Sequence, residues 1–188
     1  MLKKIVFLLA LFVASSFSNS FADGSGKVII TPTATCADQA LQLNGFGTRK
    51  KLFIKLYVAS LYLQKKSNDG SLLLEMAQAS CMRLHITSSK ITSEKMIKAT
   101  REGFETSTQG NTAPIETEIK TFLSWLEQPI KKGDEFEFAF IPHNTTYVSK
   151  NGSPLGMIES KEFSTALFGI WLGDTPVQQD LKDKLLGK

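Results

Sequence analysis

The sequence predicts a mixed α+β domain, in which an antiparallel sheet carries a layer of helices on one face. Three patterns lead to this prediction. Residues 53–63 are almost continuously apolar, which indicates a central strand that is covered on both faces. Residues 135–140 alternate between phenylalanine and polar or small side chains, which indicates a strand with one face in water. Asn151-Gly152 separates two short extended runs, a combination typical of a hairpin.

The other expected elements follow from hydrophobic spacing and from turn residues. Apolar side chains that recur at intervals of three and four predict amphipathic helices. Thr92 is the expected N-cap of the first helix, and Thr175-Pro176 are the expected cap and first-turn proline of the last. In chain order, the further strands are expected at 27–31, 40–45 and 80–88, and the helices at 90–104, 113–128, 160–173 and 177–187.

Residues 1–22 have the features of a secretory signal peptide. A short basic start with Lys3 and Lys4 precedes an apolar run at 5–13, and small residues lead to a cleavage site at Ala22. A retained membrane anchor is the alternative, but the run is too short, because a bilayer span needs about 20 apolar residues. We therefore expect cleavage, a periplasmic or secreted protein, and no stable membrane insertion of the mature chain.

The remaining chain, residues 23–188, has the length of one domain. It contains no second stretch long enough to cross a membrane, no repeat and no linker rich in proline or serine. The full chain carries a net charge of +4, part of which belongs to Lys3 and Lys4. Because no basic block longer than three residues remains, this charge is weak evidence for binding to nucleic acid or to an anionic membrane surface, and nucleic acid is not an expected partner.

Two cysteines, Cys36 and Cys81, leave two possibilities open. An exported protein in an oxidising compartment can join them in a disulfide. They can equally be two separate buried thiols, because sequence does not show how close their Cα atoms lie. Their spacing is not that of a CxxC motif, so neither redox catalysis nor a zinc site is expected.

Motifs of the common enzyme classes are missing from the sequence. It contains no GxSxG, no HExxH and no Walker or dinucleotide glycine pattern, so no cofactor is expected. His85 and His143 lack acidic or cysteine neighbours at the spacing of metal ligands, so no metal site is expected either. The acidic residues are scattered among lysines, as on solvated helix faces, and do not suggest a pair of catalytic carboxylates.

The region around residues 43–63 resembles the signature of the chalcone isomerase-like family. A glycine-containing turn and an arginine lead into a long strand, in the sequence LNGFGTRKKLFIKLYVASLYL. Further family-like motifs follow in order, namely SEK, KKGDEFEF, NGSPLG and FGIWLGDTPVQQDLKDKLLG. The resemblance covers about residues 36–187 and is closest to the exported bacterial branch. It implies an open-faced β-sandwich, with a ligand cleft between a large antiparallel sheet and a layer of helices.

Plant chalcone isomerases of this family hold their substrate with a set of polar side chains that this sequence retains only in part. Arg49 matches the arginine of that set, and Lys95 matches the lysine at the helix start. Tyr57 replaces a threonine, Thr92 replaces the tyrosine that assists at the ketone, and Ala99 replaces an asparagine. Each lost polar contact of this kind lowers a rate by a factor of about 10² to 10³. Authentic chalcone isomerase activity is therefore not expected.

The fatty-acid-binding members of the family offer a closer parallel. They combine the arginine with a tyrosine at the threonine position, which is the combination of Arg49 and Tyr57 here. A guanidinium is a planar, permanently charged donor for a carboxylate, and a phenol adds one more donor. The resemblance thus implies a non-catalytic binder of a small apolar carboxylate, such as a fatty acid, with Lys95 and Thr92 also near the ligand. The alternatives are an isomerase or lyase-type enzyme on another substrate, and an envelope protein-interaction domain.

The two principal residues of this proposed site are separated by eight positions. Along an unbroken strand, Arg49 and Tyr57 would lie about 26 Å apart. They can share a ligand only if the chain turns between Lys50 and Phe53, as the family pattern implies. In that case Tyr57 lines the cleft, while Lys55 points to its rim with its aliphatic stem packed.

Overall fold

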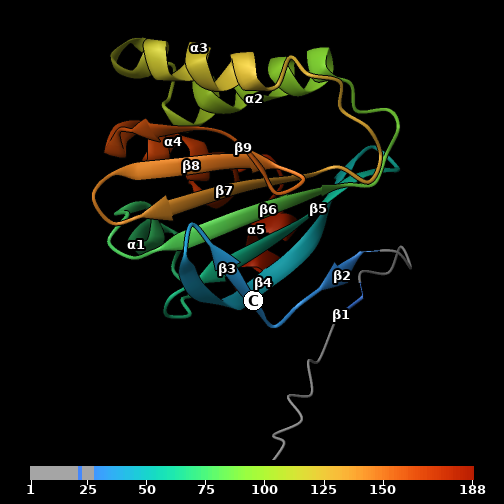
Figure 1. The fold of residues 1–188 in the computed structure, drawn as a ribbon, viewed down its shortest axis with the longest axis vertical. Helices are drawn as coiled ribbons and strands as arrows, with labels where there is room; N and C mark the ends of the chain where they lie inside the picture. The colour runs from blue at the N-terminus through green and yellow to red at the C-terminus, as the bar shows by residue number, and fades with distance from the viewer. Residues whose placement is uncertain (1–20, 23–27) are drawn as a thin grey trace, which may run out of the picture.

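The computed structural model describes residues 21–22 and 28–188. A seven-stranded antiparallel sheet curls into a half-barrel, and its strands lie in space in the order of the sequence (Figure 1). A separate two-stranded sheet pairs β1 (Phe21–Ala22) with β2 (Ile29–Ile30). The strands of the large sheet are β3 (Thr33–Cys36), β4 (Gln39–Lys51), β5 (Ile54–Leu63), β6 (Ser80–Ile86), β7 (Glu135–Ile141), β8 (Thr145–Lys150) and β9 (Ser153–Glu159).

Helices cover one face of this sheet, as the sequence predicts. α4 and α5 lie behind the sheet in Figure 1, while α2 and α3 lie above it. α2 packs on α4, α3 packs on α2 and on the edge strand β9, and α5 packs on β4 and β5. Their bounds are α1 (Gly70–Leu74), α2 (Ser93–Ser107), the short 3-10 helix Ala113–Ile115, α3 (Glu116–Trp125), α4 (Lys161–Leu172) and α5 (Gln179–Leu185). The predicted α+β class, with a large antiparallel sheet and a layer of helices, is confirmed.

The alternation predicted for residues 135–140 separates the two faces of the sheet. Phe136, Phe138 and Phe140 are buried in the main core beneath the helices. Glu135 and Glu137 are only half-buried, on the opposite face. Because side chains alternate along a strand, one apolar set fills the space under the helices while the polar set stays at the other face.

Ion pairs occupy that opposite face. Arg83 and His85 of β6 stand directly across from Glu137 and Glu135 of β7. Nη2 of Arg83 lies 2.8 Å from the Glu137 carboxylate, and Nδ1 of His85 lies 2.9 Å from that of Glu135. The hydrogen bond from His85 is the main cause that lowers the pKa of Glu135 below its ordinary value, against the opposing effect of burial. His85 is therefore a structural partner of a carboxylate.

A second, smaller core covers the same face of the sheet near its first strands. Val28 and Ile30 pack there against Val58 and Tyr62 of β5. The main core reaches β5 from the other side, so this strand is covered on both faces over most of its length. The beginning of the strand departs from the prediction, because Phe53, Ile54 and Lys55 are exposed.

The same small core contains the disulfide that the sequence left open. Cys36 at the end of β3 is bonded to Cys81 in β6, and their Cα atoms lie 6.4 Å apart. Tyr62, which lies opposite Cys81 in the pairing of β5 with β6, packs in the same cluster. The bridge therefore ties the edge of the sheet to a strand near its centre.

The predicted signal peptide, residues 1–22, lies outside the described residues apart from the two that form β1. Within the described part of the chain, no helix is both long enough and apolar enough to cross a membrane.

The first strands differ most from the prediction. The expected short strand at 40–45 is part of β4, a strand that continues to Lys51 and forms a hairpin with β5. Leu52 and Phe53 form the turn, and Leu52 has φ of +55°. Such a backbone conformation favours glycine or asparagine, so the sequence offered no turn residue by which to recognise the hairpin. The neighbouring strand β3 and the short helix α1 were not predicted.

The last helix also begins later than expected. α5 starts at Gln179, and no side chain caps it. Thr175 and Pro176 instead contribute to the wall of a cleft. The side chain of Gln178, the residue before the helix, forms hydrogen bonds with the backbone of Thr48 and Lys50 in β4. These hydrogen bonds hold the segment in an extended conformation up to Gln178, and the helix begins at Gln179.

Candidate functional site

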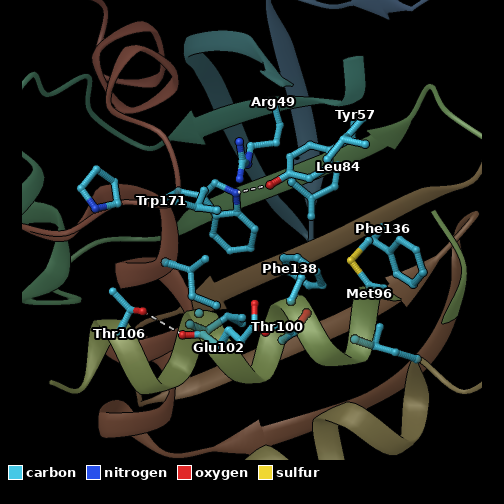
Figure 2. Close-up of a pocket in the computed structure, with 18 of the residues that line it drawn as sticks. Arg49, Tyr57, Leu84, Met96, Thr100, Glu102, Thr106, Phe136, Phe138 and Trp171 are labelled. Atoms are coloured by element: carbon cyan, nitrogen blue, oxygen red, sulfur yellow. Dashed lines mark hydrogen bonds between the residues drawn. The ribbon is translucent and has the colours of Figure 1, made fainter. Parts of the chain in front are cut away.

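A mostly apolar cavity lies between the inner face of the sheet and helices α2 and α4, with a volume of about 290 Å³ (Figure 2). This volume is near the lower end of the range for sites that hold one small molecule. Most of its wall is apolar, and Figure 2 shows the side chains of Phe136, Phe138, Leu84 and Met96 around it. The other apolar lining residues are Leu56, Ala99, Gly103, Phe122, Leu126, Leu167, Ile170, Trp171, Pro176 and Val177.

Arg49 and Tyr57 meet at one end of this cavity. The β4–β5 hairpin places them directly opposite each other, as a pair of facing residues in neighbouring strands. A register shift follows between Arg49 and Lys50. The turn at residues 52–53 therefore resolves the distance problem, since facing side chains on adjacent antiparallel strands lie about 5 Å apart at Cβ and not about 26 Å.

Tyr57 is buried, and a tryptophan fixes its hydroxyl group. Nε1 of Trp171, on α4, donates a hydrogen bond of 2.9 Å to the Tyr57 hydroxyl (Figure 2). Burial raises the pKa of Tyr57 above its ordinary value, and the Trp171 hydrogen bond and the charge of Arg49 offset only part of this effect. The phenol thus stays protonated. Because Trp171 can only donate, the phenol proton remains for an acceptor in the cavity.

Gln178, in the segment before α5, positions Arg49. Nη1 of Arg49 donates to Oε1 of Gln178 at 3.0 Å and also to the Lys50 carbonyl oxygen. The same Gln178 oxygen accepts the Lys50 backbone N–H at 2.7 Å, and the amide Nε2 donates to the Thr48 carbonyl at 3.3 Å. Neutral acceptors hold this guanidinium, and no carboxylate of the described residues forms an ion pair with it. A carboxylate ligand would supply that counter-charge.

Thr92 and Lys95 do not join this pair. Thr92 is the N-cap of α2, as predicted, and its Oγ1 accepts the Lys95 backbone N–H at 3.3 Å. The Lys95 side chain is exposed and donates to the Lys90 carbonyl oxygen. Neither residue lines the cavity. The structure therefore brings together two of the four site residues expected from the sequence, and gives Thr92 a role in starting the helix.

Two residues important for the site were missed in the sequence. Trp171 and Gln178 orient Tyr57 and Arg49, although they lie more than a hundred positions further along the chain. Trp171 stood in a stretch that is apolar on all sides, and a buried indole N–H needs an acceptor, which was a usable signal. Gln178 gave no such signal, because the sequence placed it in the first turn of the last expected helix.

The helix α2 forms the wall opposite the sheet. Ala99 and Thr100 face the cavity from this helix (Figure 2 labels Thr100). Gly103 permits the close approach of α2 to α4, because a Cβ at that position would lie 3.0 Å from Cδ1 of Ile170. Ala99 thus presents only a methyl group to the ligand space.

The ionisable side chains around the cavity do not form a nucleophile–base pair. Among the described residues that line it, these side chains are Arg49, Lys51, Tyr57 and Glu102. Glu102 is exposed at the rim, and the phenol of Tyr57 is held protonated. A positive group and a neutral donor at one end of an apolar space suit the binding of an anion with an apolar body.

One group of potential metal ligands occurs elsewhere in the described residues. Cys36, Cys81 and Glu137 have ligand atoms within 4.8 Å of one another, on the face of the sheet opposite the cavity. The two cysteines form the disulfide, and a disulfide has no thiolate to offer a metal ion.

Comparison with known proteins identifies the family. A family model described as chalcone isomerase-like matches residues 22–187. The chain belongs to the chalcone isomerase-like family. Among solved structures it is similar to a fatty-acid binding protein of Arabidopsis thaliana, with a TM-score of 0.71 and 14% sequence identity. The similarity covers 89% of this chain and 96% of the plant protein, and at this identity it establishes the fold. A search of curated proteins finds no match.

Proposed function

We propose that this chalcone isomerase-like protein is a non-catalytic binder of a small apolar carboxylate, such as a fatty acid. The observation that carries the proposal is the meeting of Arg49 and Tyr57 at one end of an apolar cavity. The guanidinium supplies charge and paired donors for the carboxylate, and the phenol supplies one further donor. The aromatic side chains of the sheet would surround the hydrocarbon part of the ligand.

The family comparison supports this ligand class, because the similar plant structure is that of a fatty-acid binding protein. The changed positions of the catalytic set support binding without catalysis. Ala99 cannot hydrogen-bond a substrate, and Thr92 caps its helix outside the cavity lining. An isomerase or lyase would need an acid or base beside the substrate, and the neutral phenol of Tyr57 is suited to donating a hydrogen bond rather than removing a proton.

We further propose that the protein is an exported member of the family that acts in the periplasm or outside the cell. The features of residues 1–22 motivate this proposal. The Cys36–Cys81 disulfide supports it, because disulfides persist in oxidising compartments and are rare in the cytosol. N-terminal sequencing of protein isolated from its own host tests the proposal: a mature chain beginning near Asp23 is expected, and an intact Met1 in the isolated protein contradicts it.

Arg49→Ala is expected to weaken the binding of a fatty acid by about 10- to 150-fold. This range corresponds to the loss of a hydrogen bond to a charged group, about 1.5–3 kcal/mol. Calorimetric titration with a series of fatty and aromatic acids, each beside its methyl ester, measures the effect. Arg101→Ala is the matched control, because Arg101 pairs with Glu116 away from the cavity lining. Equal binding of acid and ester by the wild type, with Arg49→Ala unchanged, would refute the proposal.

Tyr57→Phe is expected to weaken the binding of the same fatty acid by about fivefold, which corresponds to about 1 kcal/mol. One donor is lost while the ring still fills its place, and the charge of Arg49 remains. The variant also leaves the Trp171 N–H without its acceptor, so a small decrease in unfolding free energy should accompany the loss of affinity. Parallel calorimetry and urea unfolding separate the two effects. An affinity equal to that of the wild type would show that the phenol does not contact the ligand.

A further inference from the structure

The two most exposed large apolar side chains of the described chain lie at the tip of the β4–β5 hairpin. Phe53 is 100% exposed, Leu52 is 86% exposed, and Ile54 beside them is 45% exposed. These three residues, called the hairpin tip here, follow one another without a polar residue between them. Single exposed apolar residues are common on proteins, but a contiguous apolar tip indicates a contact surface.

The backbone at the tip makes this choice of residues unfavourable for the isolated domain. Leu52 has a positive φ of +55°, at the first position of a two-residue hairpin turn. Glycine is the favoured residue there, and a left-handed conformation is strained for an L-residue with a branched side chain. Because Leu52 is exposed, packing within the domain does little to offset this strain. Burial of the Leu52 side chain against a surface outside the domain would offset this strain.

Exposed lysines surround the tip. Lys50, Lys51 and Lys55 flank it in sequence. The loop after β6 and the loop before β7 lie at the same end of the sheet as the tip. The Thr87 N–H donates a hydrogen bond to the Leu56 carbonyl of β5, and the Gly133 N–H donates one to the Ile86 carbonyl of β6. Figure 1 shows these loops beside the hairpin at the right of the view. They add three more exposed lysines, Lys90, Lys131 and Lys132.

The tip also lies next to residues that line the cavity. Lys51, which pairs with Ile54, lines the cavity together with Leu56 and the partly exposed Val177. An apolar carboxylate that leaves the Arg49 end of the cavity toward the tip would therefore pass between apolar side chains and lysines. An apolar tip in a ring of cations is the combination that binds the interface of an anionic bilayer.

We propose that the hairpin tip docks the protein onto anionic phospholipid membranes. Phe53 and Leu52 enter the boundary between headgroups and acyl chains, and the surrounding lysines contact the anionic headgroups. The contact is peripheral and reversible, since it involves one turn of the chain rather than a spanning segment. Exchange of the ligand between cavity and membrane during docking is the part of this inference that rests on the proposed function. The docking itself does not depend on it.

Sedimentation with lipid vesicles tests the docking. The vesicles are phosphatidylcholine alone, and phosphatidylcholine mixed with phosphatidylglycerol. The wild type is expected to sediment with the mixed vesicles, more weakly at higher salt, and little with phosphatidylcholine alone. Phe53→Ser should lower the partition coefficient on mixed vesicles by about tenfold. Neutralising Lys50 and Lys55 with Gln should lower it by about fivefold for each lysine.

A variant at Leu52 separates docking from folding. Asparagine tolerates a positive φ, so Leu52→Asn should leave the melting temperature unchanged or raise it while it weakens vesicle binding. The matched controls lie at the other end of β5, where Leu72 of α1 is exposed and Lys65 and Lys66 follow the strand. Leu72→Ser and the Gln variants of Lys65 and Lys66 should bind vesicles as the wild type does.

Several results would overturn the proposal. They are a wild type that fails to sediment with anionic vesicles, a Phe53→Ser variant that sediments as well as the wild type, and control variants that lose as much binding as the tip variants. The last result would mean that overall charge, not the tip, binds the vesicles. Calorimetry with fatty acids on Phe53→Ser, which lies outside the cavity lining, keeps the two proposals separate. Vesicle binding without fatty-acid binding would refute only the proposed function, and the reverse would refute only the docking.

Discussion

Phe104→Ala is expected to lower the free energy of unfolding by about 3–5 kcal/mol, the range for removing a buried phenylalanine ring. Phe104 is 0% exposed in the last turn of α2. Its ring centroid lies 6.1 Å from that of Phe122 on α3 and 5.4 Å from that of Phe163 on α4. Three helices therefore meet at this side chain. The loss includes both the transfer of the ring and the cavity that remains, because neighbouring helices cannot fill the space completely.

Urea unfolding of the variant beside the wild type measures this effect. The chain offers a matched control in Phe53→Ala, which removes the same ring from a position that is 100% exposed. The control should change the unfolding free energy by no more than about 0.5 kcal/mol. A loss below about 1 kcal/mol for Phe104→Ala would mean that α2 contributes little to the stability of the domain.

The position of α2 matters for the site as well as for stability. This helix supplies the wall of the cavity that faces the sheet, and it is held against α4 by the Phe104 cluster and by the close approach at Gly103. Arg49 and Tyr57, in contrast, belong to the sheet. The charged end of the site is therefore built by strands paired through backbone hydrogen bonds, while its apolar wall depends on helix packing. A change that loosens the packing of α2 should therefore weaken the binding of ligands with a long apolar chain more than the binding of ligands with a short one.

The sequence was informative where local chemistry decides the structure. Asn151 and Gly152 both have positive φ and form the predicted hairpin between β8 and β9. Thr92 caps α2 as predicted, and the alternation at 135–140 gave the correct buried face of β7. In each case, a residue type with a specific backbone preference or a strict period identified the element.

The sequence failed where local preference and structure disagree. Leu52 forms a turn although leucine is disfavoured at positive φ, so no turn residue in the sequence predicts the β4–β5 hairpin. Only the family resemblance led us to expect that Arg49 and Tyr57 could lie near each other. Trp171 and Gln178 were missed for a different reason. Their roles arise from contacts with residues more than a hundred positions away, and no periodicity carries such information.

The disulfide is the remaining feature that the sequence could not decide. Two cysteines separated by 45 positions predict either a bridge or two thiols, because the answer depends on how β3 is placed beside the sheet. Cys36 lies at the end of the edge strand, and Cys81 lies in β6, two strands beyond β4. Only the curl of the sheet, with the small core of Val28, Ile30 and Tyr62, brings these two positions together.

Removing this disulfide is expected to lower the free energy of unfolding by about 4 kcal/mol. In the chain-entropy model the bridge closes a loop of 45 residues that contains β4, β5 and α1, and so restricts the unfolded chain. The core around Cys36 and Cys81 should keep the native sheet in place at low denaturant. Guanidinium unfolding with and without a thiol reductant measures the difference. The double variant with Ser at both positions should unfold at the lower midpoint under both conditions.

The control for this experiment is a thiol titration of denatured protein freshly isolated under non-reducing conditions, which should find no free thiol. Two thiols per chain, or equal midpoints with and without reductant, would show that the bridge is not formed or does not stabilise the fold. The result also bears on the ligand site. β4 and β5, which carry Arg49 and Tyr57, lie inside the closed loop, so reduction should weaken ligand binding only as far as it unfolds the sheet. Full ligand affinity in the reduced, still folded protein would show that the disulfide contributes to the stability of the domain and not to ligand binding.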